Sequence, residues 1–143
     1  MTDDIAKVPA DEIFELVTDR WTEPFWNAAR RHVLTAPKCA SCGAFRMPPT
    51  PFCPHCLSQE LEWPELSGQG TVYSFTVVNR AIIPAMEATL PYVPAIVELP
   101  DAPGVRLVSN IVDVPVSAIA IGQTVRLRWH DRADGVSVPC FTF

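Results

Sequence analysis

Four cysteines in two short motifs carry the clearest chemistry of this sequence. Cys39-Ala40-Ser41-Cys42 and Cys53-Pro54-His55-Cys56 are two CxxC units with ten residues between them. Each CxxC turn presents two sulfurs to one side, so two facing turns predict a tetrahedral site with four thiolate ligands. Four sulfurs leave no position for water, which indicates a structural metal rather than a catalytic one. Both zinc and iron accept four thiolates, so the ligands alone do not separate Zn²⁺ from iron.

The residues around the cysteine motifs support the same interpretation. Gly43 directly follows the first pair, where such a knuckle commonly needs a residue in the left-handed conformation. His55 lies inside the second motif and is interpreted as a neighbour of the metal, since four cysteines already complete the site. Cys140 stands alone and is expected to be a buried apolar residue in the last strand.

A catalytic site should leave a nucleophile, a base and a group that orients them. The three histidines, His32, His55 and His130, do not lie in a recognisable catalytic motif, and the sequence has no GxSxG, HExxH or phosphate-binding glycine loop. His130 precedes Asp131 and is expected in a loop at the rim of a barrel. The sequence therefore does not predict catalysis by this chain on its own.

Length, composition and charge limit the class of protein further. The 143 residues are 48% hydrophobic and 19% charged, which suits one folded domain with a core. The net charge of −5 argues against a nucleic-acid partner, because phosphate binding needs a basic surface. Apolar runs are too short for a membrane span, and the acidic N-terminus does not look like a signal peptide. We therefore expect a cytoplasmic protein, whose reducing surroundings favour metal-bound cysteines over disulfides.

The elements that position the cysteines fall into three regions. Two helices are expected before the motifs, a short one carrying Ile13, Phe14, Leu16 and Val17, and a second from Pro24 to Leu34 with Thr22 as its N-cap. After the motifs the pattern alternates as in strands. The expected strands are Thr71–Val78, Val93–Leu99, Val105–Ile111, Thr124–Trp129 and Val136–Phe141, with a turn or helical piece at Val114–Ile121. Gly68-Gln69-Gly70 is interpreted as a flexible segment before the first of them.

Five strands with an insertion after the third predict a Greek-key barrel of the OB type. The expected fold class is mostly β with N-terminal helices, in which a rubredoxin-like zinc ribbon precedes a five-stranded OB-fold. The expected division is a helical arm at 1–36, the zinc ribbon at 37–66 and the OB-fold at 67–143.

The assembled pattern resembles a family of acyl-CoA-associated zinc-ribbon/OB-fold proteins. The resemblance runs from about Thr22 to Phe143 and includes the segments FWNAARRHVL, KCASCGAFRMPPTPFCPHC, LEWPELSGQGTVYSFTVVNR, PYVPAIVELPDAPGVRLVSNIV and IGQTVRL. Its most specific parts are the two cysteine motifs, the pair Pro48-Pro49 and the stretch from Ser67 to Thr76.

The resemblance implies a non-catalytic accessory subunit. Such subunits bind thiolase-superfamily enzymes, which supply the catalytic residues, and help to bind or channel the acyl-CoA substrate. Since thiolase-like partners are usually dimers, it also implies a hetero-tetramer of two plus two subunits. The resemblance does not name the acyl group, nor say whether the assembled enzyme condenses or cleaves carbon–carbon bonds.

Two groups of residues are candidates for contacts with these partners. The phosphates of CoA need cations, for which Lys38, Arg46, Arg80 and Arg106 are candidates, since they lie in expected loops or at strand ends. The aromatic residues Trp21, Phe25 and Trp26 either pack against the knuckles or the barrel, or form the contact with the partner enzyme, because aromatic side chains contribute much of the energy of interfaces.

Two alternative functions remain open at this point. A nucleic-acid-binding protein is conceivable because OB-folds and zinc ribbons both bind oligonucleotides, although the acidic charge argues against it. A stand-alone enzyme acting on acyl-CoA would need a catalytic residue that the sequence does not reveal.

Overall fold

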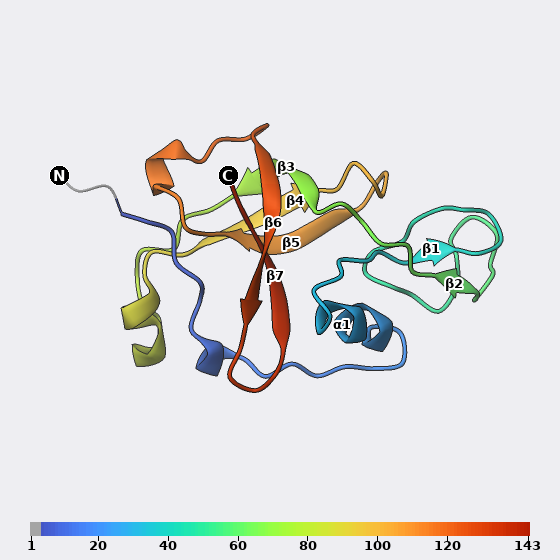
Figure 1. Cartoon of the computed structure of the whole chain (residues 1–143), viewed down its shortest axis with the longest axis horizontal. Coiled ribbons are helices and arrows are strands. Elements are labelled where there is room, and N and C mark those ends of the chain that lie inside the picture. Colours follow the sequence, from blue (N-terminus) through green and yellow to red (C-terminus); the bar gives the residue numbers. More distant parts are fainter. Residues whose placement is uncertain (1–3) are drawn as a thin grey trace.

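The computed structural model of the protein describes residues 4–143 and shows a barrel with a small ribbon extending from one end (Figure 1). The elements in chain order are η1 (Asp11–Ile13), α1 (Glu23–Ala29), β1 (Lys38–Cys39), β2 (Leu61–Glu62), β3 (Gln69–Phe75), η2 (Pro84–Thr89), β4 (Val93–Glu98), β5 (Arg106–Ile111), η3 (Val116–Ala118), β6 (Thr124–Asp131) and β7 (Ser137–Thr142). Among the described residues, none of the helices has the length and apolar character needed to cross a membrane.

The barrel is closed in the order β3-β4-β5-β7-β6. Its neighbouring strands are antiparallel except β5 and β7, which run parallel and share the single pair Ile111–Phe141. Strand β3 pairs with β6 through its first residues and with β4 through the rest, with a bulge between Val72 and Ser74. A strand shared between two halves of the sheet in this way closes a small Greek-key barrel. The predicted fold class is confirmed, and each of the five predicted strands overlaps an observed one.

The alternating pattern that predicted the strands also builds the core. In β4, Val93, Ala95 and Val97 point inward and are at most 3% exposed, while the residues between them are half-buried. Gly70 at the start of β3 is also buried, and its backbone packs closely against β4. A Cβ atom added there would lie 2.4 Å from Val97 Cγ1. The expectation that Gly70 belongs to a flexible segment is therefore wrong, since it permits the close packing of two strands.

The segment before α1 differs from the predicted helical arm. The described part, which starts at residue 4, is mostly extended, and its helical content is the single turn η1. Two side chains of the expected apolar stripe, Phe14 and Val17, are 51% and 83% exposed. Ala6, in contrast, is buried and exchanges hydrogen bonds with the backbone of Asp113 and Val114. The barrel thus offers hydrogen-bond partners to the backbone of this segment. An extended chain can bond to them, whereas a short isolated helix is only marginally stable.

Helix α1 is shorter than predicted, because it ends at Ala29 instead of Leu34. His32 has a positive φ of 56°, its N–H donates to the Ala29 carbonyl, and the N–H of Val33 donates to the Ala28 carbonyl. These bonds form a Schellman motif, which ends a helix and turns the chain away. Its left-handed position usually holds glycine, so a histidine there gave no sequence signal.

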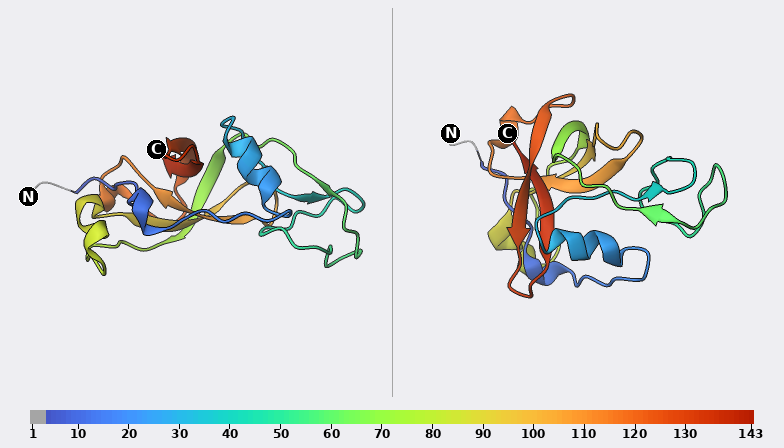
Figure 2. Two further views of the ribbon diagram at one scale, coloured as in Figure 1. Left: turned by 90° about the horizontal axis from the view of Figure 1, so that it is seen from below. Right: turned by 45° about the vertical axis from the view of Figure 1, so that its right-hand side comes forward.

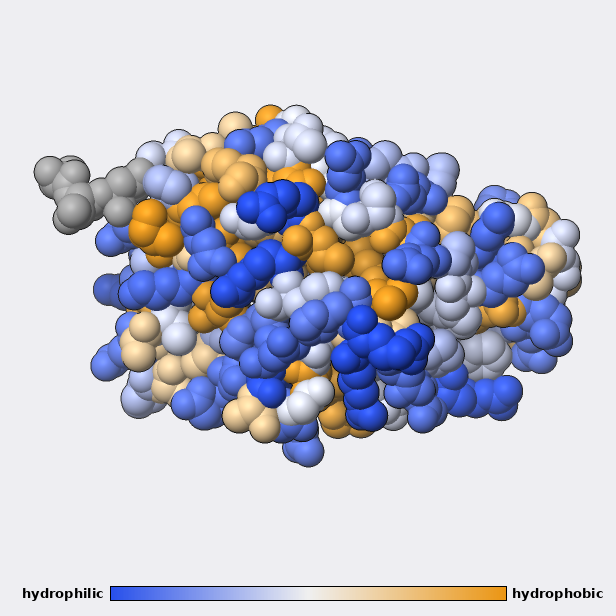
Figure 3. Space-filling view, in the orientation of Figure 1, coloured by the Kyte–Doolittle hydropathy of each residue, from blue (hydrophilic) through white to orange (hydrophobic). Residues whose placement is uncertain are grey.

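The ribbon is attached to the barrel by the chain segments on either side of it. The N–H of Leu66 donates to the Leu34 carbonyl at 2.8 Å, and Thr35 pairs with Glu65. Figures 1 and 2 show the ribbon at one end of the molecule and η2 at the opposite end. On the face seen in Figure 3, hydrophobic side chains gather over the barrel, whereas the ribbon end is mainly hydrophilic or neutral.

Candidate metal centre and the pocket beside it

The two cysteine motifs fold into knuckles with the same backbone hydrogen bonds. In the first, the Cys39 N–H donates to the Ala44 carbonyl and the Gly43 N–H donates to the Cys39 carbonyl. In the second, Cys53 makes the equivalent bonds with Ser58 and Leu57. The fifth residue of each knuckle has a positive φ, 80° at Gly43 and 65° at Leu57. The predicted left-handed conformation at Gly43 is confirmed.

The knuckles bring the four sulfur atoms together at distances that suit one metal ion. The Sγ atoms of Cys39 and Cys56, and those of Cys42 and Cys53, are 3.6 Å apart, and all four lie within 4.8 Å of one another. Four ligands at a zinc–sulfur distance of about 2.3 Å in a tetrahedron would lie about 3.8 Å apart. A disulfide would require about 2.05 Å. The four cysteines are thus positioned to bind a metal ion.

Backbone N–H groups around the sulfurs favour the thiolate form in part of the site. The N–H of Cys42 is the largest influence lowering the pKa of Cys39, to about 6, and the N–H of His55 lowers the pKa of Cys53. At Cys56 the N–H of Ser58 also lowers the pKa, but the neighbouring thiols outweigh it and raise it to about 11. The pKa is therefore lowered at one cysteine of each knuckle, Cys39 and Cys53, which favours the thiolate form that a metal ion binds.

The burial of the sulfurs shows which side of the site faces the protein. Cys39 and Cys53 are at most 1% exposed, whereas Cys42 and Cys56 are exposed. The side chain of His55 is exposed and does not belong to the group of converging ligand atoms. Four sulfurs fill a tetrahedral site, so its chemistry is structural and a bound substrate would find no free coordination position.

The histidines outside the knuckles hold chain segments together. His32 Nε2 lies 2.7 Å from Asp131 Oδ1, and its ring stacks on Trp129 at a centroid distance of 5.3 Å. His130 Nε2 lies 2.8 Å from Asp11 Oδ1 and so ties the N-terminal segment to the barrel. The expected loop position of His130 is wrong, because β6 continues to Asp131. The hydroxyl of Ser137 and then His32 lower the pKa of Asp131, so its carboxylate is ionised near neutral pH.

The four cations considered for CoA binding do not form one cluster. Arg80 lies in the connection between β3 and η2, and η2 lies at the end of the molecule opposite the ribbon (Figure 1). Arg106 begins β5, where its guanidinium lies 3.9 Å from the centre of the Tyr73 ring and 3.3 Å from Glu98. Lys38 is half-buried in β1.

Arg46 differs from the other three cations because it is buried, with 7% of its surface exposed. Its Nε donates to the Thr50 carbonyl at 3.0 Å. Its Nη1 and Nη2 atoms are buried and lack a hydrogen-bond partner among residues 4–143. Direct contact between Arg46 and a CoA phosphate would therefore require the ribbon to open.

The three aromatic residues considered for partner contact have different surroundings. Phe25 is 5% exposed and belongs to the core, where it meets Trp26 edge to face at 5.0 Å. Trp26 is half-buried, and Trp21 is half-buried with Arg20 lying 4.9 Å above its ring. Trp21 and Trp26 thus present surface to solvent, and Phe25 positions α1.

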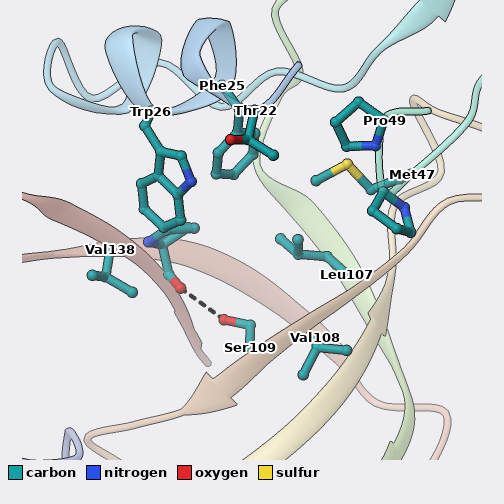
Figure 4. Close-up of a pocket in the computed structure, with 11 residues that line it drawn as sticks. Thr22, Phe25, Trp26, Met47, Pro49, Leu107, Val108, Ser109 and Val138 are labelled. Atoms are coloured by element: carbon teal, nitrogen blue, oxygen red, sulfur yellow. Dashed lines mark hydrogen bonds between the residues drawn. The ribbon is translucent and has the colours of Figure 1, made fainter. Parts of the chain in front are cut away.

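The sequence did not predict an apolar pocket beside α1. It is lined by side chains from three distant segments: α1 and the residue before it, the proline-rich loop of the ribbon, and strands β5 and β7 (Figure 4). The lining residues are Thr22, Phe25, Trp26, Met47, Pro48, Pro49, Leu107, Val108, Ser109, Val138 and Pro139. One signal did exist, because Val108 is apolar at a position of β5 whose side chain faces solvent and is 76% exposed.

Comparisons with known proteins agree with this fold and site. Residues 26–62 match the family described as "ChsH2, rubredoxin-like zinc ribbon domain", and residues 63–130 match "ChsH2, C-terminal OB-fold domain". A probable enoyl-CoA hydratase alpha subunit of Thermomonospora curvata is 41% identical over 82% of this chain, but the match spans only 36% of that relative.

Two further matches cover most of both proteins. A DUF35 domain-containing scaffold protein of Methanocaldococcus jannaschii is 34% identical over 85% of this chain and 88% of its own length. A chain of the solved structure named "Ltp2-ChsH2(DUF35) aldolase" superposes with a TM-score of 0.81 and 36% identity, over 90% of this chain and 98% of that one. The chain therefore belongs to the DUF35 family, whose ChsH2-type members join a rubredoxin-like zinc ribbon to an OB-fold.

Proposed function

We propose that this chain is a non-catalytic accessory subunit, which binds a thiolase-superfamily enzyme and helps to bind its acyl-CoA substrate. The observation that carries the proposal is the match over 98% of a chain in the Ltp2-ChsH2(DUF35) aldolase, whose name joins a DUF35 protein to a second protein. The name of the Methanocaldococcus jannaschii relative, a scaffold protein, supports the same role. The hydratase name attached to the longer Thermomonospora curvata relative does not carry over, because this chain matches about a third of that protein.

The geometry of the described residues supports a structural role. The four sulfurs close their site completely, and His32 and His130 are both held by carboxylates that fasten chain segments to the barrel. A general base must instead reach a substrate proton within hydrogen-bond distance. The catalytic groups of the reaction would then come from the partner enzyme.

We propose zinc as the resident metal and Cys39, Cys42, Cys53 and Cys56 as its ligands. The sulfur distances and the match to a zinc ribbon family support this assignment. A thiolate site needs a reducing compartment, so a cytoplasmic location belongs to the same proposal. Elemental analysis of protein purified without added metal tests it, with about one zinc per chain expected. A stoichiometric amount of iron in place of zinc would contradict the assignment.

The positions of the cations refine the proposal for CoA contacts. Lys38 lies in β1 of the ribbon and Arg106 at the start of β5, whereas Arg80 lies in the connection before η2 and Arg46 is buried. We therefore propose Lys38 and Arg106 as the first candidates for phosphate contact. Reversal of both charges should raise the Michaelis constant of the assembled enzyme for acyl-CoA, and the same change at Arg80 serves as the control.

We propose that the partner contacts Trp21 and the exposed edge of Trp26, in an assembly of two plus two subunits. A stable contact of this kind buries more than about 1,000 Å² in total. Aromatic residues near the centre of such an interface dominate its energy. Phe25 contributes indirectly, because its burial in the core fixes the orientation of α1.

Co-expression tests the proposed function. The tagged chain is expressed with each thiolase-superfamily protein of its own genome, and the purified material is separated by size. One of these proteins should co-elute with the chain, and Trp21→Ala should weaken the complex about tenfold or more. Ile82→Ala is the matched control, because Ile82 is 86% exposed and lies two residues before η2, the helix at the end opposite the ribbon. If the chain elutes alone with every candidate, the proposed function is wrong.

A further inference from the structure

The apolar pocket lies where the barrel is split. Strands β5 and β7 pair only at Ile111–Phe141, so toward the start of β5 the two strands separate. One hydrogen bond crosses the opening, from Ser109 Oγ to the Pro139 carbonyl at 2.7 Å (Figure 4). Phe25 and Trp26 of α1 cover one side of the split, and the Met47–Pro49 loop covers another. The pocket therefore lies where the topology of the barrel separates two neighbouring strands.

The chemistry of the lining favours a ligand without hydrogen-bonding groups. Two side-chain hydroxyls line the pocket, and both are engaged, that of Ser109 with Pro139 and that of Thr22 with Asp19. The remaining lining side chains are aliphatic, aromatic, thioether or proline, and the polar group among them is the indole N–H of Trp26. A polar group placed here would lose its water and gain at most a bond from this N–H, which costs free energy. A hydrocarbon group meets no such cost.

The size of the pocket limits what enters it. Its volume of about 200 Å³ exceeds the roughly 150 Å³ of an apolar cavity that is known to bind benzene. Pockets that enclose whole drug-sized ligands have volumes of about 300 Å³ or more. The pocket thus fits a hydrocarbon group of about six carbon atoms, with the rest of the molecule outside.

The rim favours a small-molecule chain over a peptide side chain. Three of the lining residues, Pro48, Pro49 and Pro139, have no backbone N–H to offer. A peptide that inserted a side chain here would bring its own carbonyl groups to this rim and would need donors for them. An alkyl chain passing over Val108 needs no hydrogen-bond donors, because it has no carbonyl groups.

We propose that this pocket holds the apolar end of the acyl group of an acyl thioester. The identification of the thioester rests on the proposed function, whereas the preference for a hydrocarbon group of about six carbons rests on the pocket itself. Acyl groups of six or more carbons fill the pocket, and acetyl groups are too short to do so. The chain would then select thioesters by the length of their apolar end.

The test uses the full chain without a partner, labelled with ¹³C at its methionine methyl groups. Met47 lines the pocket, while Met86 is buried within η2 and serves as an internal reference. We expect hexanoyl-CoA to shift the Met47 signal and leave Met86 unchanged. Affinity should rise roughly tenfold from butanoyl-CoA to hexanoyl-CoA, as expected for the burial of two methylene groups. A Met47 signal that stays unmoved at saturating hexanoyl-CoA would overturn the inference.

A variant that fills the mouth of the pocket completes the test. Val108→Trp places a large ring at an exposed position, and Ile121→Trp is the matched control at an exposed position outside the lining. Val108→Trp should weaken hexanoyl-CoA binding at least tenfold, and Ile121→Trp should not change it. Val138→Phe, from the opposite wall, provides a second blocking variant if Val108→Trp does not fold.

Partner binding separates this inference from the proposed function. If the blocking variants abolish co-purification with the partner but leave hexanoyl-CoA binding intact, the pocket receives a partner side chain and the inference is overturned, while the proposed function stands. If hexanoyl-CoA binds at Met47 and no thiolase-superfamily protein co-purifies, the pocket assignment stands and the proposed function fails.

Discussion

Leu57 occupies in the second knuckle the position that Gly43 occupies in the first. Both residues have a positive φ, of 65° and 80°, and both donate their N–H to the first cysteine carbonyl of their knuckle. For a residue with a Cβ atom, this conformation costs about 1–2 kcal/mol. Leu57 is 73% exposed, so its side chain contributes little burial in compensation. Leu57→Gly should remove the strain.

The expected size of the effect follows from two opposing terms. Relief of about 1–2 kcal/mol is offset by the greater freedom of glycine in the unfolded chain, about 0.5–1 kcal/mol. The net stabilisation is about 0.5–1 kcal/mol, or a two- to fivefold gain in metal affinity, because metal binding and folding are coupled in such sites. Gly43→Ala should act in the opposite direction by about 1 kcal/mol. Its new Cβ would meet only Lys38 Cε at 3.7 Å, an ordinary contact, so its cost is that of the backbone alone.

Competition with a chromogenic zinc chelator measures both variants under the same conditions. The order of affinity should be Leu57→Gly above the unmodified chain and Gly43→Ala below it. If Leu57→Gly binds the metal more weakly, the side chain of Leu57 contributes more than its exposure indicates. If Gly43→Ala has no effect, the assignment of strain to the two left-handed positions is wrong.

Four further substitutions test other parts of the structure. Gly70→Ala should lower the free energy of unfolding by about 1–3 kcal/mol in a denaturant titration, because its Cβ would collide with Val97 Cγ1. An unchanged denaturant concentration at the midpoint of unfolding would contradict the close packing of β3 on β4. Cys56→Ser should remove the metal and unfold the ribbon, which elemental analysis and circular dichroism measure. His55→Ala should retain the metal. Loss of metal from His55→Ala would show that the ligand set is misassigned. Because the pKa of the Asp131 carboxyl is lowered in the folded protein, the ionised carboxylate stabilises the fold at neutral pH, and this stabilisation is lost as the pH falls below about 4. Asp131→Asn should therefore reduce the loss of stability at acid pH. An unaltered dependence of the free energy of unfolding on pH would refute this role of Asp131.

The parts of the fold that the sequence predicted well are those in which nearby residues determine the structure. The CxxC spacing defines a knuckle by itself, and alternation along β4 places Val93 and Val97 inside the barrel regardless of what they meet there. The end of α1 was missed because it depends on His32 in a left-handed conformation, held by Trp129 and Asp131 from β6. Contacts between residues so far apart in the chain leave no local pattern.

The candidate site shows the same limit. Arg46 was expected to be a solvated charge or a phosphate contact, and the aromatic character of Phe25 left both packing and partner contact open. Both residues are buried by packing that only the folded chain defines. The apolar pocket was missed for a related reason. It exists because β5 and β7 separate beyond Ile111–Phe141, and its lining comes from three segments that the chain brings together only on folding.

Native mass spectrometry of the co-expressed material tests the central claim most directly. We predict a complex that contains this chain and a thiolase-superfamily protein in equal numbers, two of each, with one zinc ion retained per copy of this chain. Dissociation in the gas phase should release this chain with its metal still bound. Detection of only the free chain, after co-expression with every thiolase-superfamily protein of its genome, would contradict the claim that it is an accessory subunit.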